Sequence, residues 1–127
     1  MDFGVGQATQ IGLSIAHRNG YDHIVTLDAD GAHNPKDIPS LLDTHIKQGN
    51  LLTIGNRWYQ GYTKNIPGAK WWANVFAAHL INRISNLNLP DVACGLRVIS
   101  ADLITVLGKT MDFGFLYETI FYANQVG

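Results

Sequence analysis

The sequence has 127 residues, of which 46% are hydrophobic, and these values suit about one packed domain. With a formal net charge of −1, the chain has no overall positive potential that would attract nucleic acid, so general nucleic-acid binding is not expected. The one cysteine, Cys94, can form neither an internal disulfide nor a zinc framework, which favours a reducing, cytoplasmic setting.

The chain opens with a helical pattern that is followed by a strand. Apolar side chains at helical spacing predict a helix over residues 6–19, with Ile11, Ile15 and Ala16 on its buried face. Residues 24–27 form a short, branched and nearly all apolar run. That pattern is typical of a strand buried on both faces of a parallel sheet.

A second helix and a second strand follow. Asn34 can cap the helix and Pro35 suits its first position, and Gly49 ends it. The buried stripe is expected to contain Ile38, Leu41, Leu42 and Ile46. Residues 51–54 read as the next strand, so the alternating order predicts a mostly parallel α/β sheet with right-handed crossovers.

The second half begins with a polar loop over residues 57–68 and a long helix over residues 69–87. The apolar residues at helical spacing in that helix are Trp72, Val75, Phe76, Leu80 and Ile84. A turn around Gly95 then leads into a short strand, and two short helices are predicted over residues 101–107 and 117–125.

Two carboxylates, Asp28 and Asp30, follow directly after the first predicted strand. Ligands of open α/β sheets collect at the carboxyl ends of strands, and paired carboxylates there suit a divalent cation that bridges to phosphates. A solvated acidic turn is the plainer interpretation. A third is a haloacid-dehalogenase-like phosphohydrolase with Asp28 as nucleophile, although Ala32 stands where that family has Thr or Val.

Two further segments carry charged groups after predicted strands or turns. Arg57 follows the second strand, where it could hold phosphate oxygens or pair with a surface acid. Residues 91–97 place an aspartate, a glycine and Arg97 close together, either for binding or to brace a turn. Cys94 is expected to be a small buried residue, and His33 either lines the site or begins a helix.

Several motifs in order resemble one family. They read GVGQA at residues 4–8, LDADGAHNPKDIP at 27–39, GNR at 55–57, DVACGLR at 91–97 and FLYE at 115–118. In this order and spacing they resemble the family-two inverting glycosyltransferases of the dolichyl-phosphate mannosyltransferase type, which act on polyprenyl phosphates. The resemblance covers nearly the whole chain.

The resemblance implies a partial glycosyltransferase-A-type, Rossmann-like fold, a nucleotide-sugar donor, a polyprenyl-phosphate acceptor and Mg²⁺ or Mn²⁺. It implies transfer with inversion at a cytoplasmic membrane face. Asp28 and Asp30 would be the catalytic residues that bind the metal. Asp28, Arg57 and Arg97 would contact the donor and its phosphates, and Lys70 and Arg97 the acceptor. Of Trp71 and Trp72, at least one is expected in the core, although tryptophan also suits a membrane interface.

The sequence departs from the family pattern in ways that bear on activity. Ala32 stands where the family has a glutamine on the metal side. The family's first nucleotide-binding strand and its C-terminal end have no counterpart, so residues 1–127 are interpreted as a single incomplete catalytic domain. An inactive truncated domain is therefore an alternative, and uncovered strand edges predict marginal stability or self-association.

Overall fold

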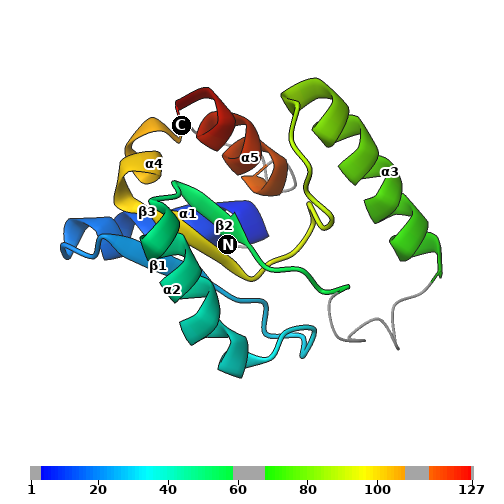
Figure 1. The fold of residues 1–127 in the computed structure, drawn as a ribbon. Helices are drawn as coiled ribbons and strands as arrows, with labels where there is room; N and C mark the ends of the chain where they lie inside the picture. Colours follow the sequence, from blue (N-terminus) through cyan, green and yellow to red (C-terminus); the bar gives the residue numbers. More distant parts are fainter. Residues whose placement is uncertain (1–3, 59–67, 108–114, 127) are drawn as a thin grey trace.

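A computed structural model describes residues 4–58, 68–107 and 115–126, and within them strands and helices form one α/β arrangement (Figure 1). The elements are α1 (Val5–Arg18), β1 (His23–Thr26), the 3₁₀ turn η1 (Pro35–Asp37), α2 (Ile38–Gln48), β2 (Leu52–Ile54), α3 (Gly68–Ser85), β3 (Arg97–Ser100), α4 (Ala101–Val106) and α5 (Phe115–Val126). All the elements expected from the sequence are present. Of the expected polar loop, residues 59–67 lie outside the described part.

Local sequence signals explain where several helices begin and end. The Asn34 side chain accepts a hydrogen bond of 3.1 Å from the backbone N–H of Lys36, so it caps η1, from which α2 continues. Gly49 follows α2 with a φ of 64°, a left-handed conformation that favours glycine. Asn86 has a φ of 54° directly after α3, so that helix ends before Pro90 is reached.

The sheet of the described residues has the order β1-β3-β2, and both pairings are antiparallel. The expectation of a mostly parallel sheet is therefore not confirmed. The chain places β3 between the two earlier strands. Because both pair antiparallel with β3, β1 and β2 still run in the same direction. Thr26 and Ile54 both lie opposite Arg97, so the carboxyl ends of β1 and β2 are level at one edge.

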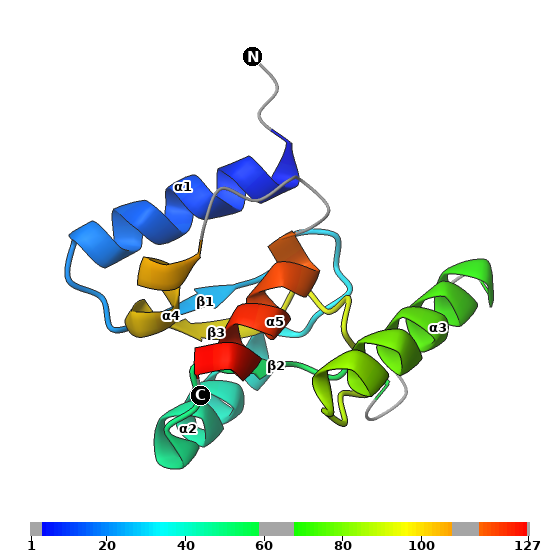
Figure 2. The same ribbon diagram turned by 90° about the horizontal axis from the view of Figure 1, so that it is seen from above.

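Helices cover the two faces of this sheet, and Figure 2 shows the strands between α1 and α2. On one face Ile99 packs with Leu13 of α1 and Leu103 of α4. All residues of β3 are buried, whereas β1 is only half-buried. The strand that is covered on both faces is thus the central β3 and not the 24–27 run, because the latter lies at the margin of the described sheet.

The other face holds α2 through a hydrogen-bonded histidine. His45 is fully buried, its Nδ1 lies 2.8 Å from Oγ1 of Thr53, and its Nε2 lies 3.0 Å from Oγ of Ser100. The hydroxyl of Ser100 donates a hydrogen bond to the carbonyl oxygen of Asn50. The Ser100 oxygen therefore accepts from the Nε2–H of His45, and Nδ1 of His45 accepts from the hydroxyl of Thr53. Burial, and secondarily the neighbouring His23, lowers the pKa of His45. The expected apolar stripe of α2 is only half-buried or, at Ile46, exposed.

The predicted buried faces of α1 and α3 are also wrong. Ile11 and Ile15 are about half exposed, while Leu13 is buried. Along α3, all five apolar residues that were expected at helical spacing are exposed. Trp71 is exposed as well, so the expectation that at least one of Trp71 and Trp72 lies in the core is wrong. The buried residues of α3 are Asn74, Ala78, Ile81 and Ser85. The small residue Ala78, with Ile81, packs α3 against Val92 and Ile120, which turns the larger side chains outward.

Candidate functional site

The candidate site lies at the edge of the sheet where β1 and β2 end. The segment before β3 is tied to both strands there: the hydroxyl of Thr26 donates to the carbonyl oxygen of Gly95 at 2.9 Å, and the N–H of Gly55 donates to that of Leu96, also at 2.9 Å. Asp28 follows β1 and Arg57 follows β2. Two segments far apart in sequence, each predicted to carry chemistry, are thus held at one edge by residues 91–97.

Gly95 makes room for Asp28. A Cβ atom at position 95 would overlap both carboxylate oxygens of Asp28, so only glycine allows this approach. The Asp28 side chain is 49% exposed, which leaves part of the carboxylate open to solvent. The turn predicted around Gly95 therefore has a specific role: it shapes the surface on which Asp28 rests.

Arg57 is held by Asp91 in a two-point contact. Its Nε donates to Oδ2 at 2.7 Å and its Nη2 to Oδ1 at 2.8 Å, and its backbone N–H donates to Oδ2 at 3.2 Å. Asp91 is buried, and the Arg57 side chain is 18% exposed. The hydrogen bonds to Asp91 raise the pKa of Arg57. Nη1 makes no hydrogen bond within the described residues, so a fixed guanidinium keeps donors for an anion.

The second carboxylate of the pair closes a tight turn. Oδ1 of Asp30 accepts a hydrogen bond of 2.9 Å from the N–H of Ala32, and Gly31 between them has a φ of 79°. No cluster of three or more His, Cys, Asp or Glu side chains that could hold a metal lies within the described residues. Two carboxylates supply hard oxygen ligands, which fit Mg²⁺ or Mn²⁺ where phosphates and water complete the shell.

His33 lies beside Asp28 and Cys94, and its proximity to these two residues was not predicted from the sequence. Its side chain is 4% exposed; Nε2 lies 3.8 Å from Oδ2 of Asp28, and Nδ1 lies 3.9 Å from Sγ of Cys94. Cys94 is buried as expected, and burial raises its pKa to about 11, so the thiol keeps its proton near neutral pH. The signal available in the sequence was the position of His33 just after the acidic pair.

Arg97 is directed into the fold. It is fully buried, and its guanidinium donates to the carbonyl oxygens of Val92 and Cys94, both at 2.8 Å, and to Oγ1 of Thr119 at 2.6 Å. Burial lowers its pKa to about 10. This differs from the expected contacts with donor and acceptor phosphates. In this structure Arg97 braces the 91–97 segment and α5.

Lys70 lies in the first turn of α3 and is exposed. A lysine near a helix N-terminus adds positive charge to the positive end of the helix dipole, an arrangement that favours a bound anion. Among the described residues, no contact joins Lys70 to Asp28 or Arg57 in the structure.

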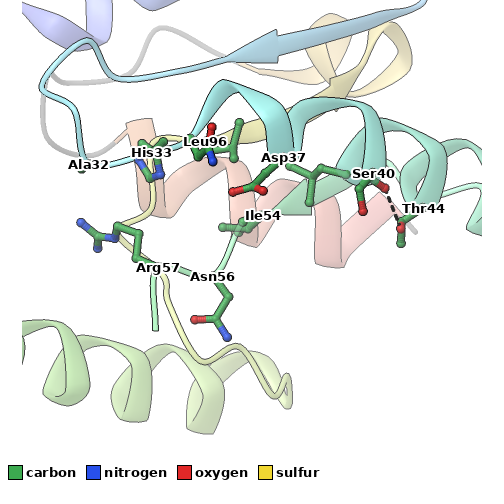
Figure 3. Close-up of a pocket in the computed structure, with 12 residues that line it drawn as sticks. Ala32, His33, Asp37, Ser40, Thr44, Ile54, Asn56, Arg57 and Leu96 are labelled. Atoms are coloured by element: carbon green, nitrogen blue, oxygen red, sulfur yellow. Dashed lines mark hydrogen bonds between the residues drawn. The ribbon is translucent and has the colours of Figure 1, made fainter. Parts of the chain in front are cut away.

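A cavity of about 380 Å³ opens between the loop after β1 and α2. Figure 3 shows His33 and Arg57 at one end of it and Ser40 and Thr44 along α2 at the other. Asp37 and Asn56 also line it, so hydrogen-bonding groups lie beside apolar side chains such as Leu41 and Ile54. Ala32 lines it as well, and its short side chain leaves more space than the glutamine of the family pattern would. The cavity suits a small polar ligand.

Comparisons with known proteins identify relatives of this chain. It is similar to an undecaprenyl-phosphate mannosyltransferase of Micrococcus luteus, with 30% identity over 98% of this chain and 52% of the relative. It is similar to a UDP-N-acetylglucosamine–dolichyl-phosphate N-acetylglucosaminyltransferase of Methanococcus voltae, with 32% identity over 85% of this chain and 43% of the relative. It is also similar to a polyprenol monophosphomannose synthase of Mycolicibacterium smegmatis, with 30% identity over 80% of this chain and 38% of the relative. No solved structure gives a significant match.

The chain spans about half or less of the length of these relatives. The family model described as glycosyl transferase family 2 matches residues 2–108, which include both acidic residues, Arg57 and the whole 91–97 segment. The resemblance drawn from the sequence motifs is thereby confirmed. The chain belongs to glycosyl transferase family 2.

Proposed function

We propose that this chain forms the central part of a catalytic domain that transfers a sugar from a nucleotide-sugar donor to a polyprenyl phosphate. The observation that carries the proposal is the meeting of Asp28 and a clamped Arg57 at one sheet edge. The names of the relatives support the acceptor class. The family match favours transfer over hydrolysis through a phosphoaspartate.

In this proposal Arg57 binds the phosphates with the N–H groups that Asp91 does not use. Asp91 fixes the plane of the guanidinium before the ligand arrives, so little ordering entropy is lost on binding. Arg97 acts indirectly, because it holds the carbonyl groups of the 91–97 segment on which Asp28 rests. The cavity beside His33 receives part of the donor.

Asp28 and Asp30 are the residues that would hold Mg²⁺ or Mn²⁺. Such an ion, when bound, supplies Lewis-acid stabilisation of the charge that develops on a departing nucleoside diphosphate. The acceptor phosphate is already an anion at neutral pH, so its oxygen attacks the anomeric carbon without a general base. The new carbon–oxygen bond forms opposite the leaving diphosphate, which inverts the configuration.

The exposed face of α3 supports a lipid-borne acceptor. Trp72, Phe76 and Ile84 are 65–70% exposed, and with Leu80 they recur every fourth residue along one face of the helix. No helix within the described residues is long and apolar enough to cross a bilayer. We propose that this stripe, with Lys70 at its start, lies on the membrane surface and presents the acceptor phosphate to Arg57.

The donor site is tested by nucleotide binding. Quenching of tryptophan fluorescence by GDP and by UDP, with and without Mn²⁺, should show metal-dependent binding. The Arg57→Gln variant should bind about tenfold or more weakly, because a charge-assisted contact to phosphate is lost. Arg18→Gln removes an exposed arginine far from the site and should bind like the parent chain. A folded chain that binds neither nucleotide would be an inactive domain, and trapping of a phosphoaspartate at Asp28 would establish hydrolysis instead.

The membrane surface is tested with vesicles of phosphatidylcholine and phosphatidylglycerol. Trp72→Ala with Phe76→Ala removes two exposed aromatic side chains and should weaken flotation with the vesicles about tenfold or more. Ile11→Ala with Ile15→Ala removes exposed apolar residues of α1 and serves as the matched control. Equal losses in the two double variants would contradict a role for α3.

A further inference from the structure

His33 is a buried side chain with an unused polar atom at the edge of the candidate site. Its Nε2 is buried and makes no hydrogen bond, while the ring itself is 4% exposed. Buried nitrogen atoms of this kind are normally hydrogen-bonded, so each exception calls for an explanation. The nearest acceptor is a carboxylate oxygen of Asp28, 3.8 Å away.

The surroundings of the ring favour a hydrogen on Nε2. Nδ1 faces Sγ of Cys94 at 3.9 Å, and a thiol can either donate to it or accept from it. A second acceptor for the thiol is the carbonyl oxygen of Leu96, at 3.7 Å, so the sulfur alone does not decide the tautomer. The carboxylate does: with the hydrogen on Nδ1, the lone pair of Nε2 would face an anionic oxygen, whereas Nε2–H would face it as a donor.

We propose that His33 is a positioning residue for Asp28, whose Nε2–H holds Oδ2 so that Oδ1 is presented to the donor and its metal. The inference rests on the proposed function and adds a residue to it. The contact has to shorten by about 1 Å to become a hydrogen bond, and such contacts are often long until the ligand is bound. Gly95 also lies against this carboxylate, so the position of Asp28 depends on both His33 and Gly95.

The first test concerns the free chain and needs no ligand. Long-range ¹⁵N–¹H correlation spectra of the imidazole groups report which ring nitrogen of His33 carries the hydrogen. We expect the Nε2–H tautomer, and we expect the Nε2 resonance to shift in Asp28→Asn. Hydrogen on Nδ1, or an Nε2 chemical shift that is the same in Asp28→Asn as in the parent chain, would overturn the proposal.

The second test compares two amides. The amide nitrogen of Gln can replace Nε2, whereas that of Asn reaches only as far as Nδ1. His33→Asn should weaken binding of Mn²⁺ with GDP or UDP about tenfold, as expected for one charge-assisted hydrogen bond, and His33→Gln should restore most of it. Thermal unfolding of the two variants should agree within about 2 °C, which separates positioning from folding.

The outcomes separate the two proposals. If the parent chain binds either nucleotide and His33→Asn binds equally well, the role of His33 is refuted and the donor site stands. If the parent chain binds neither nucleotide, the donor site is refuted, and the tautomer with its response to Asp28→Asn alone decides the contact between His33 and Asp28.

Discussion

The pair of Arg57 and Asp91 offers the sharpest test of how the site is held. The Asp91 carboxylate accepts four hydrogen bonds: two from the guanidinium, one from the backbone N–H of Arg57 at 3.2 Å and one from that of Ala93 at 3.3 Å. Asp91→Asn keeps the shape and one oxygen but places an NH₂ group where an acceptor stood. Each oxygen accepts one guanidinium N–H and one longer bond from a backbone N–H, so in either orientation the amide turns one strong and one weak hydrogen bond into contacts between donors.

The size of the effect follows from burial. Losing a hydrogen bond to a charged group and leaving a buried donor unsatisfied costs about 2–3 kcal/mol. Arg57 is 18% exposed and can turn partly toward water, so we take the lower end, about 2 kcal/mol, for Asp91→Asn. Arg57→Gln leaves a buried carboxylate without its cation, and we expect about 3 kcal/mol. For a chain of this length, 1 kcal/mol corresponds to about 4 °C in Tm.

A double-mutant cycle read by urea and thermal unfolding measures the pair directly. Asp91→Asn should lower Tm by about 8 °C and Arg57→Gln by about 12 °C. In the double variant the two amides can bond to each other, so its loss should fall short of the sum by at least 1 kcal/mol, on the order of measured couplings. Losses that add within about 0.3 kcal/mol would show that the two side chains do not act as a pair, and the reasoning would be refuted.

Three further predictions concern single residues. Gly95→Ala should displace the Asp28 carboxylate and abolish metal-dependent nucleotide quenching while Tm falls by only about 4 °C, since Asp28 can rotate into solvent. Gly12→Ala, in an α1 position with open space around it, should instead raise the free energy of unfolding by about 1 kcal/mol and leave binding unchanged. The pKa of His45 in the native state lies below the ordinary value of 6.5. Below pH 6.5, therefore, His45 binds a proton more readily in the unfolded chain than in the native state. Stability measured by urea unfolding should therefore fall as the pH is lowered through 6.5, and less steeply in His45→Gln.

Much of the local structure could be predicted because its causes are local. The capping side chain of Asn34, the left-handed Gly49 and the apolar run before Asp28 each act within a few residues. The functional motifs were predictable for a related reason: Asp28 and Arg57 directly follow strands that run in the same direction, so they meet at one edge whichever strand lies between them.

The faces of the helices could not be predicted in this way. Periodicity shows that α3 has an apolar stripe, but it does not say whether that stripe meets the core. The structure buries Ala78 and Ile81 and exposes Trp72 and Phe76, because the packing partner is the surface formed by Val92 and α5. The same holds for His45, whose burial depends on hydroxyl groups from two different strands.

The sequence by itself determined the helices, the strands, the family and the acidic pair that follows β1, since each of these depends on neighbouring residues or on motif order. Only the tertiary structure decided that β3 lies between β1 and β2, that Arg57 is clamped by Asp91, and that His33 stands against Asp28. These are contacts between residues as many as 77 positions apart in the chain, such as β1 and β3 at His23 and Ser100. They form because burying the central strand on both faces stabilises the whole arrangement. That free energy depends on residues distant in the chain, so it cannot be inferred from a short segment of the sequence.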